Sequence, residues 1–121
     1  MGLKVQTSRI EPDIVVVHLS GSMTLDETEE VDSLISGLLQ RGEKKLILEL
    51  SGINRIDSVG GMELVRCFFA SREAGACLRV AGASLSVARI FEITQVATLI
   101  QSYPSVDAAC EHFPDTPETG E

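Results

Sequence analysis

The stretch LILELSGINRIDSVGG, residues 46–61, runs from an apolar segment through a turn of small residues into a helix start. Residues 46–50 are Leu and Ile apart from Glu49, which is typical of a mostly buried strand. An apolar-rich helix is predicted from Ser58 to about Ala74, before Gly75. Backbone N–H groups at a helix start lack partners and favour an anion. We therefore predict that Ser58 stands uncrowded at a helix N-terminus, where a phosphate on its hydroxyl is tolerated.

Outward from this stretch, β and α segments alternate. Strands are predicted at residues 5–9, 14–19, 46–50, 78–81 and, as a last short one, 97–100, with 51–56 as a connection. Further helices are predicted from Thr24 to Gly42, after Ser84, and at 105–111. The first two strands can pair antiparallel, whereas β-α units favour parallel pairing. The predicted fold is α/β, a mixed sheet of four or five strands with helices packed on one face.

Helix-start signals accompany two of these helices. Thr24 and Glu27 have the spacing of a capping box. Asp57 is predicted to cap the helix that begins at Ser58, because a carboxylate accepts from the N–H groups of a first turn. Gly60 and Gly61 each cost up to roughly 1 kcal/mol relative to Ala in a helix, which indicates that close approach matters more there than helix stability.

Composition bounds the function. The chain has 121 residues and a formal charge of −8, and this charge opposes binding to nucleic acid and to anionic membranes. With no Trp and one Tyr, the chain also offers few aromatic side chains for stacking on bases. Its three cysteines lack metal-ligand spacing, so reduced thiols in a cytoplasmic protein are expected. No apolar run approaches the ~20 residues that span a bilayer. We expect one domain over residues 1–113 and a disordered tail over 114–121, because the tail has no apolar residue to bury.

Catalytic patterns are missing from the sequence. It has no nucleophile elbow around Ser58, no phosphate-binding P-loop and no dinucleotide-binding glycine motif. His18 falls inside a β run and is interpreted as a packed or sheet-surface residue, and His112 stands beside the tail. Asp57 as a base for Ser58 is the alternative to the cap, but neighbours in sequence rarely meet in that geometry. We expect no enzyme, no metal and no cofactor.

The segments quoted above, together with Gly21-Ser22-Met23-Thr24, Ile56-Asp57-Ser58-Val59-Gly60 and Val87-Ala88-Arg89-Ile90-Phe91, resemble the STAS domain family over about residues 4–113. Within it, the chain is most similar to bacterial anti-sigma factor antagonists. Three positions differ from the usual pattern: Val59 replaces a small residue, Gly61 replaces Leu or Ile, and Thr24 replaces an Asp that many members carry.

The resemblance implies a protein that binds an anti-sigma factor with serine kinase activity and so frees a sigma factor. It implies that the kinase phosphorylates Ser58, that the modification ends the interaction, and that a PP2C-type phosphatase reverses it. The expected contact surface consists of Thr24, Asp57, Ser58, Val59, Gly60, Gly61 and Met62. A monomer or weak homodimer is expected.

A second hypothesis keeps the fold and changes the role. The chain would then be a non-catalytic scaffold subunit of a stress-signalling assembly or of a lipid transport system. A switch protein loses partner binding on Ser58→Asp, whereas a scaffold tolerates that change and forms large complexes.

Overall fold

A computed structural model describes residues 2–111 and 113 of the chain. Its centre is a five-stranded sheet in the order β1-β2-β3-β4-β5. The strands are β1 (Leu3–Ile10), β2 (Ile14–Met23), β3 (Lys45–Ile56), β4 (Cys77–Ala81) and β5 (Ser102–Tyr103). The β1–β2 pair is antiparallel and the other three pairs are parallel. The predicted mixed sheet is thus confirmed.

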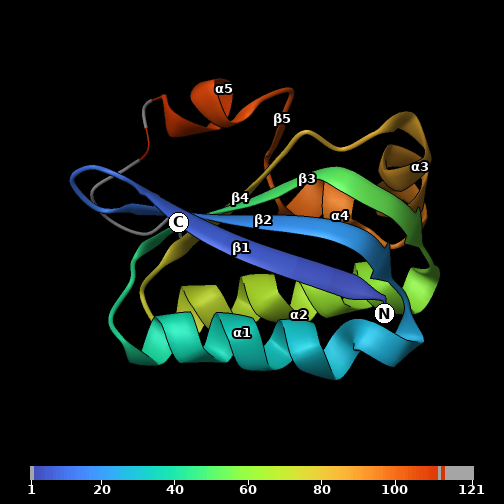
Figure 1. The fold of residues 1–121 in the computed structure, drawn as a ribbon, viewed down its shortest axis with the longest axis horizontal. Helices are drawn as coiled ribbons and strands as arrows, with labels where there is room; N and C mark the ends of the chain where they lie inside the picture. Colours follow the sequence, from blue (N-terminus) through green and yellow to red (C-terminus); the bar gives the residue numbers. More distant parts are fainter. Residues whose placement is uncertain (1, 112, 114–121) are drawn as a thin grey trace.

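Helices cover the sheet unequally (Figure 1). The short 3-10 helix η1 (Leu25–Glu27) leads into α1 (Thr28–Gln40), and β3 leads into α2 (Ser58–Glu73). After β4 come α3 (Leu85–Ile93), α4 (Val96–Leu99) and, behind β5, α5 (Val106–Cys110). In Figure 1, α1 and α2 lie side by side under one face of the sheet, and α5 lies over the other.

The alternation of side chains along β2 explains the two layers. Val15, Val17 and Leu19 point into the large core that α1 to α4 complete. Ile14 and Val16 point the other way, into a small cluster closed by Ala109 of α5. One face is therefore covered by four helices, and α5 packs on part of the opposite face.

Two predicted segments differ from the structure. Residues 51–56 were expected to connect, but β3 continues to Ile56 because β2 also continues to Met23 and pairs with it through two register shifts. Residues 97–100 were expected to form a strand, but Val96–Leu99 is helical. Val96 and Ile100 are both buried and stand four residues apart, which is a helical spacing.

The remaining boundaries agree with the sequence. Gly42, expected to end the first helix, has a positive φ of 87°, and Ser84 caps α3 by accepting from the Val87 N–H. The predicted tail at 114–121 and His112 lie outside the described residues.

Candidate functional site

Ser58 is the first residue of α2, and its side chain is exposed. Asp57 precedes it in extended conformation, and Asp57 Oδ1 accepts the N–H of Gly60 at 2.8 Å. The predicted helix cap is therefore present. The cap and the helix start could be predicted because both depend on adjacent residues, Asp57 to Gly60.

The second oxygen of Asp57 makes a contact that the sequence did not indicate. Asp57 Oδ2 accepts the N–H of Leu25 at 3.3 Å, which ties η1 to the start of α2. Thr24 stands just before η1, and the Glu27 carboxylate accepts from its N–H at 2.8 Å and from its hydroxyl at 2.9 Å. The predicted capping box is present, and Thr24 is thereby brought beside the Ser58 turn.

Gly60 and Gly61 lie on the inner side of this helix start and are buried. A Cβ on Gly60 would lie 2.0 Å from the carbonyl oxygen of Met23, and one on Gly61 would lie 2.7 Å from Thr94 Oγ1. The close approach that the two glycines indicated is thus an approach within the chain. They seat α2 against the end of β2 and the end of α3.

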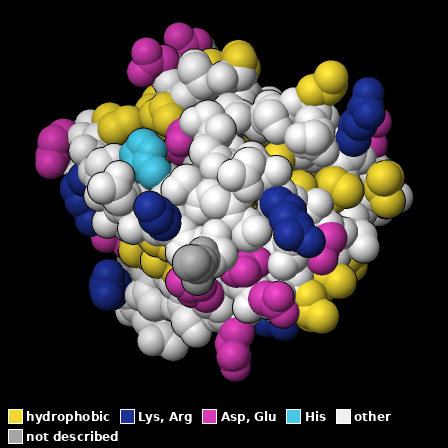
Figure 2. Space-filling view, turned by 45° about the vertical axis from the view of Figure 1, so that its right-hand side comes forward, with side chains coloured by type: hydrophobic (Ala, Val, Ile, Leu, Met, Phe, Trp, Pro, Cys, Tyr) yellow, Lys and Arg dark blue, Asp and Glu magenta, His cyan; other side chains and the backbone are white. Residues whose placement is uncertain are grey.

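Exposed apolar side chains flank Ser58. Leu25 is 62% exposed, Met62 51% and Val59 40%. We call Leu25, Ser58, Val59 and Met62 the helix-start surface. Figure 2 shows hydrophobic side chains on this side of the molecule among Lys and Arg and Asp and Glu side chains. Leu25 was missed because its neighbours in sequence indicate only a capping box, and its nearness to Ser58 depends on Asp57.

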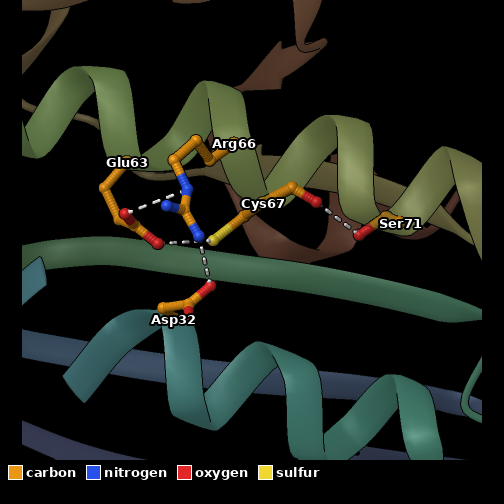
Figure 3. A network of polar contacts seen from close by, with 5 residues as sticks. All are labelled: Asp32, Glu63, Arg66, Cys67 and Ser71. Atoms are coloured by element: carbon orange, nitrogen blue, oxygen red, sulfur yellow. Dashed lines mark hydrogen bonds and ion pairs between the residues drawn. The ribbon is translucent and has the colours of Figure 1, made fainter. Parts of the chain in front are cut away.

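A polar network lies one turn further along α2 (Figure 3). Arg66 bridges the two helices, with Nη2 at 3.0 Å from Asp32 of α1 and Nε at 3.6 Å from Glu63. Glu63 is only 5% exposed, and burial raises the pKa of its carboxyl, while Arg66 opposes the rise. The Cys67 thiol donates to Glu63 at 3.7 Å, and burial raises the pKa of that thiol far above its usual range.

The face of the sheet opposite α1 and α2 carries a cavity of about 560 Å³. His18 on its floor lies 3.1 Å from Ser8 Oγ through Nε2 and 3.5 Å from Glu49 through Nδ1. His18 is therefore the sheet-surface residue that the sequence suggested. It lies on the face of the sheet opposite α1 and α2, whereas α2 and its Ser58 turn pack on the other face.

The Asp57 carboxylate of the Ser58 turn is engaged by the backbone. It accepts from the N–H groups of Leu25 and Gly60, one through each oxygen. Within residues 2–111 and 113, no group of three or more His, Cys, Asp or Glu side chains could hold a metal ion. None of the three cysteines forms a disulfide, and Cys67 and Cys77 are buried. Across the same residues, no helix combines the length and apolar character needed to cross a bilayer.

Comparison with known proteins gives the family. The STAS domain model matches residues 6–109. This chain belongs to the STAS domain family. No curated protein sequence matches this STAS domain.

Among solved structures, an anti-sigma factor antagonist from Mycobacterium paratuberculosis superposes on this STAS domain with a TM-score of 0.83. The identity is 18%, and the match covers 94% of this chain and 96% of that one. SpoIIAA, an anti-sigma factor antagonist of Bacillus, has a TM-score of 0.72 in its unphosphorylated form, at 16% identity over 87% and 92% of the two chains.

A part of a larger protein has the same fold. The murine anion transporter Slc26a9 matches with a TM-score of 0.65 at 15% identity. The match covers 89% of this STAS domain and 21% of the transporter chain. At identities this low, the TM-scores show a shared fold and no more.

Proposed function

We propose that this protein is an anti-sigma factor antagonist. It binds an anti-sigma factor with serine kinase activity through the helix-start surface, and Ser58 is the residue that the kinase phosphorylates. The observation that carries the proposal is an exposed serine at the first position of α2, flanked by the exposed apolar side chains of Leu25, Val59 and Met62. Thr24 and Asp57 hold the surface together, and Gly60 and Gly61 support it from inside.

Two comparisons support this role. The matched solved structures include several anti-sigma factor antagonists that align with nearly the whole chain. SpoIIAA is itself known in a phosphorylated and an unphosphorylated form. In the proposed step the γ-phosphoryl group of ATP moves to Ser58 Oγ, ADP leaves, and the hydroxyl proton passes to a base of the kinase. The product carries about −1.5 to −2 charges where a partner had packed on apolar side chains.

The rest of the proposal follows from that role. The protein is non-catalytic, works in the bacterial cytoplasm where sigma factors act, and is a monomer or weak homodimer between binding events. A PP2C-type phosphatase restores the binding form by removing the phosphate from Ser58. The proposed partners are proteins, without nucleic acid and without membrane insertion.

Purified protein, the candidate kinase and ATP test the proposal directly. Phosphate incorporation is measured for the wild type, for Ser58→Ala and for Ser86→Ala, which removes an exposed serine from the first turn of α3. We expect incorporation in the wild type and in Ser86→Ala, none in Ser58→Ala, and a complex on gel filtration that dissolves as Ser58 is modified. Incorporation that survives in Ser58→Ala would contradict the site.

The contact surface is tested by truncation. Leu25→Ala and Met62→Ala should each weaken the complex about tenfold, since apolar anchors at an interface centre contribute about 1–2 kcal/mol. Gln6→Ala, an exposed change on edge strand β1, is the control. Equal affinities of all three variants would show that the helix-start surface is not part of the interface.

The scaffold role is the second candidate, favoured by the match of this fold to part of an anion transporter. In that case Ser58→Asp keeps partner binding, the complex is indifferent to ATP, and the protein elutes in large assemblies. A kinase experiment without incorporation at Ser58 and with an ATP-insensitive complex would make this candidate the better one.

A further inference from the structure

Asp57 holds two elements at once. Its Oδ1 caps α2 through the Gly60 N–H at 2.8 Å, and its Oδ2 holds the Leu25 N–H of η1 at 3.3 Å. Ser58 is the next residue in the chain, with its hydroxyl at the same helix end. The Asp57 carboxylate is therefore close enough to be repelled by a negative charge added at Ser58.

A phosphate on Ser58 competes with Asp57 in two ways. It carries about −1.5 to −2 charges, which repel the neighbouring carboxylate, and its oxygens accept from the same first-turn N–H groups. The Gly60 N–H keeps an acceptor in either case, because phosphate oxygens stabilise a helix start. The longer bond, from Leu25 to Asp57 Oδ2, has no such replacement.

The 3-10 helix η1 is suited to respond. It has three residues, none of them buried, and Leu25 projects its side chain into solvent. Several of its hydrogen bonds are local: Thr24 and Glu27 bond to each other, and the Thr28 hydroxyl donates to the Leu25 carbonyl at 3.1 Å. Segments with few buried contacts open at low free-energy cost. Among residues 2–111 and 113, the bond to Asp57 is the hydrogen bond that joins Leu25 to the start of α2.

We propose that Asp57 is a positioning residue that couples Ser58 to Leu25: phosphorylation of Ser58 breaks the bond between Asp57 and the Leu25 N–H, and Leu25 leaves the helix-start surface. The partner then loses an apolar contact in addition to meeting a new charge. The inference rests on the proposed function, because it takes Ser58 as the modified residue.

Asp57→Asn separates the two contacts of this side chain. Asparagine keeps the cap, since its amide oxygen accepts from the Gly60 N–H as well as a carboxylate does. Its amide nitrogen cannot accept from the Leu25 N–H. The variant should therefore release Leu25 without a phosphate and without loss of the α2 cap.

The experiment measures amide hydrogen exchange of Leu25 and Gly60 by NMR in protein with phosphoserine encoded at position 58, so that no kinase is needed. We expect exchange at Leu25 to rise about 10- to 100-fold, the factor that corresponds to about 1.5–3 kcal/mol for a lost hydrogen bond to a charged acceptor. Asp57→Asn should show the same rise, with no further rise when phosphoserine is added. Gly60 should stay protected throughout, which also reports that α2 is folded.

Phosphoserine encoded at position 86 is the matched control, because Ser86 is an exposed first-turn serine of α3, whose cap is Ser84. It should leave Leu25 unchanged. The coupling is overturned if phosphoserine at 58 leaves Leu25 exchange as in the unmodified protein, or if it accelerates Leu25 further in Asp57→Asn. Neither result bears on whether a kinase phosphorylates Ser58. Failed incorporation by a kinase, in turn, would not bear on the coupling between Ser58 and Leu25.

Discussion

At the residue scale, Gly60 shows how little space separates α2 from the end of β2. A Cβ on this residue would lie 2.0 Å from the carbonyl oxygen of Met23 and 3.0 Å from the carbonyl carbon, and both atoms belong to the backbone. Backbone atoms cannot rotate away as the end of a side chain can. The Ser58 turn is therefore held at a fixed distance from β2, whatever the identity of the exposed residues around it.

Gly60→Ala should destabilise the protein by about 3 kcal/mol, the upper end of the usual cost of overpacking. Gly37→Ala is the control, since Gly37 lies in α1 with open space where its Cβ would stand. That change should stabilise by about 0.5–1 kcal/mol because Ala is the better helix former. Urea unfolding of both variants measures the difference, and similar midpoints for the two would be inconsistent with the close contact at Gly60.

Glu63 gives a pH dependence with a defined sign. Burial raises its pKa above the ordinary value of 4.5, so the folded protein holds this proton at pH values where the unfolded chain has released it. Stability therefore falls as pH rises through the interval above 4.5. Glu63→Gln removes that loss, so its unfolding free energy relative to wild type should grow across this interval and then level off.

Chemical denaturation at a series of pH values measures the difference in unfolding free energy between Glu63→Gln and wild type. The matched control is Glu92→Gln, which changes an exposed glutamate on α3. A constant difference between Glu63→Gln and wild type from acid to neutral pH would show that Glu63 ionises in the folded state as it does in the unfolded one.

At the scale of elements, Arg79 links α5 to the sheet. It lies on β4, its Nη1 donates to the carbonyls of Ala109 at 2.8 Å and Glu111 at 3.1 Å, and its guanidinium lies over the rings of Tyr103 and Phe113. The end of α5 thus depends on one side chain from a distant strand. Residues 78–81 were predicted as a strand, but nothing in that prediction indicated a buried arginine.

Arg79→Met keeps an apolar stem of similar length and removes the donors. We expect the amides of α5 to exchange about 10- to 100-fold faster, because a hydrogen bond to a charged group contributes about 1.5–3 kcal/mol. Amides of α1 should keep their rates. Arg89→Met, on the exposed side of α3, is the control. Unchanged exchange in α5 would mean that Ala109 and its apolar neighbours suffice to hold the helix.

Sequence patterns located most elements because their signals are local. The caps at Thr24, Asp57 and Ser84 and the turn at Gly42 each depend on residues within one helical turn. The extension of β3 to Ile56 depends instead on pairing with β2, and four of its six residues are Ser, Gly, Asn and Arg, which weaken the strand signal of the two isoleucines. A segment as short as α4 carries too few residues for its period to be recognised.

The candidate site follows the same division. Ser58, its cap and its helix were predictable from adjacent residues, and so was the flank formed by Val59 and Met62. Leu25 was not, because 32 positions separate it from Asp57 and the contact exists only after β2 and β3 have paired. The burial of Gly60 and Gly61 was also hidden, since their neighbours come from β2 and α3.

At the scale of the whole molecule, the three cysteines differ in how deeply they are buried. Cys67 and Cys77 are buried, in α2 and β4 respectively, whereas Cys110 ends α5 and is half-buried. Burial raises the pKa of both Cys67 and Cys110, so neither thiol is activated in the folded protein. Cys67 and Cys77 can therefore react with a thiol reagent only when the structure opens, and local opening of α5 exposes Cys110 further.

We expect Cys110 to react first, at a rate set by local opening of α5, and Cys67 and Cys77 to react only as the whole domain unfolds. Arg79→Met should accelerate Cys110 and leave the other two close to wild type. Mass spectrometry of the labelled peptides over time gives the three rates. Simultaneous labelling of all three cysteines would mean that α5 and the central sheet open as one unit.

Gly2 determines how this protein can be handled in the laboratory. Its carbonyl accepts the N–H of Ser22 at 2.5 Å, and a Cβ on Gly2 would lie 1.9 Å from the Glu27 carboxylate, so the chain passes directly beside η1 before it enters β1 (Figure 1). A purification tag, fluorophore or surface linker joined ahead of Gly2 would start close to Glu27 of η1, the short helix that also carries Leu25. Such an attachment can mask a partner in a pull-down or a biosensor experiment, and a cleavable tag removed before the assay avoids a false negative.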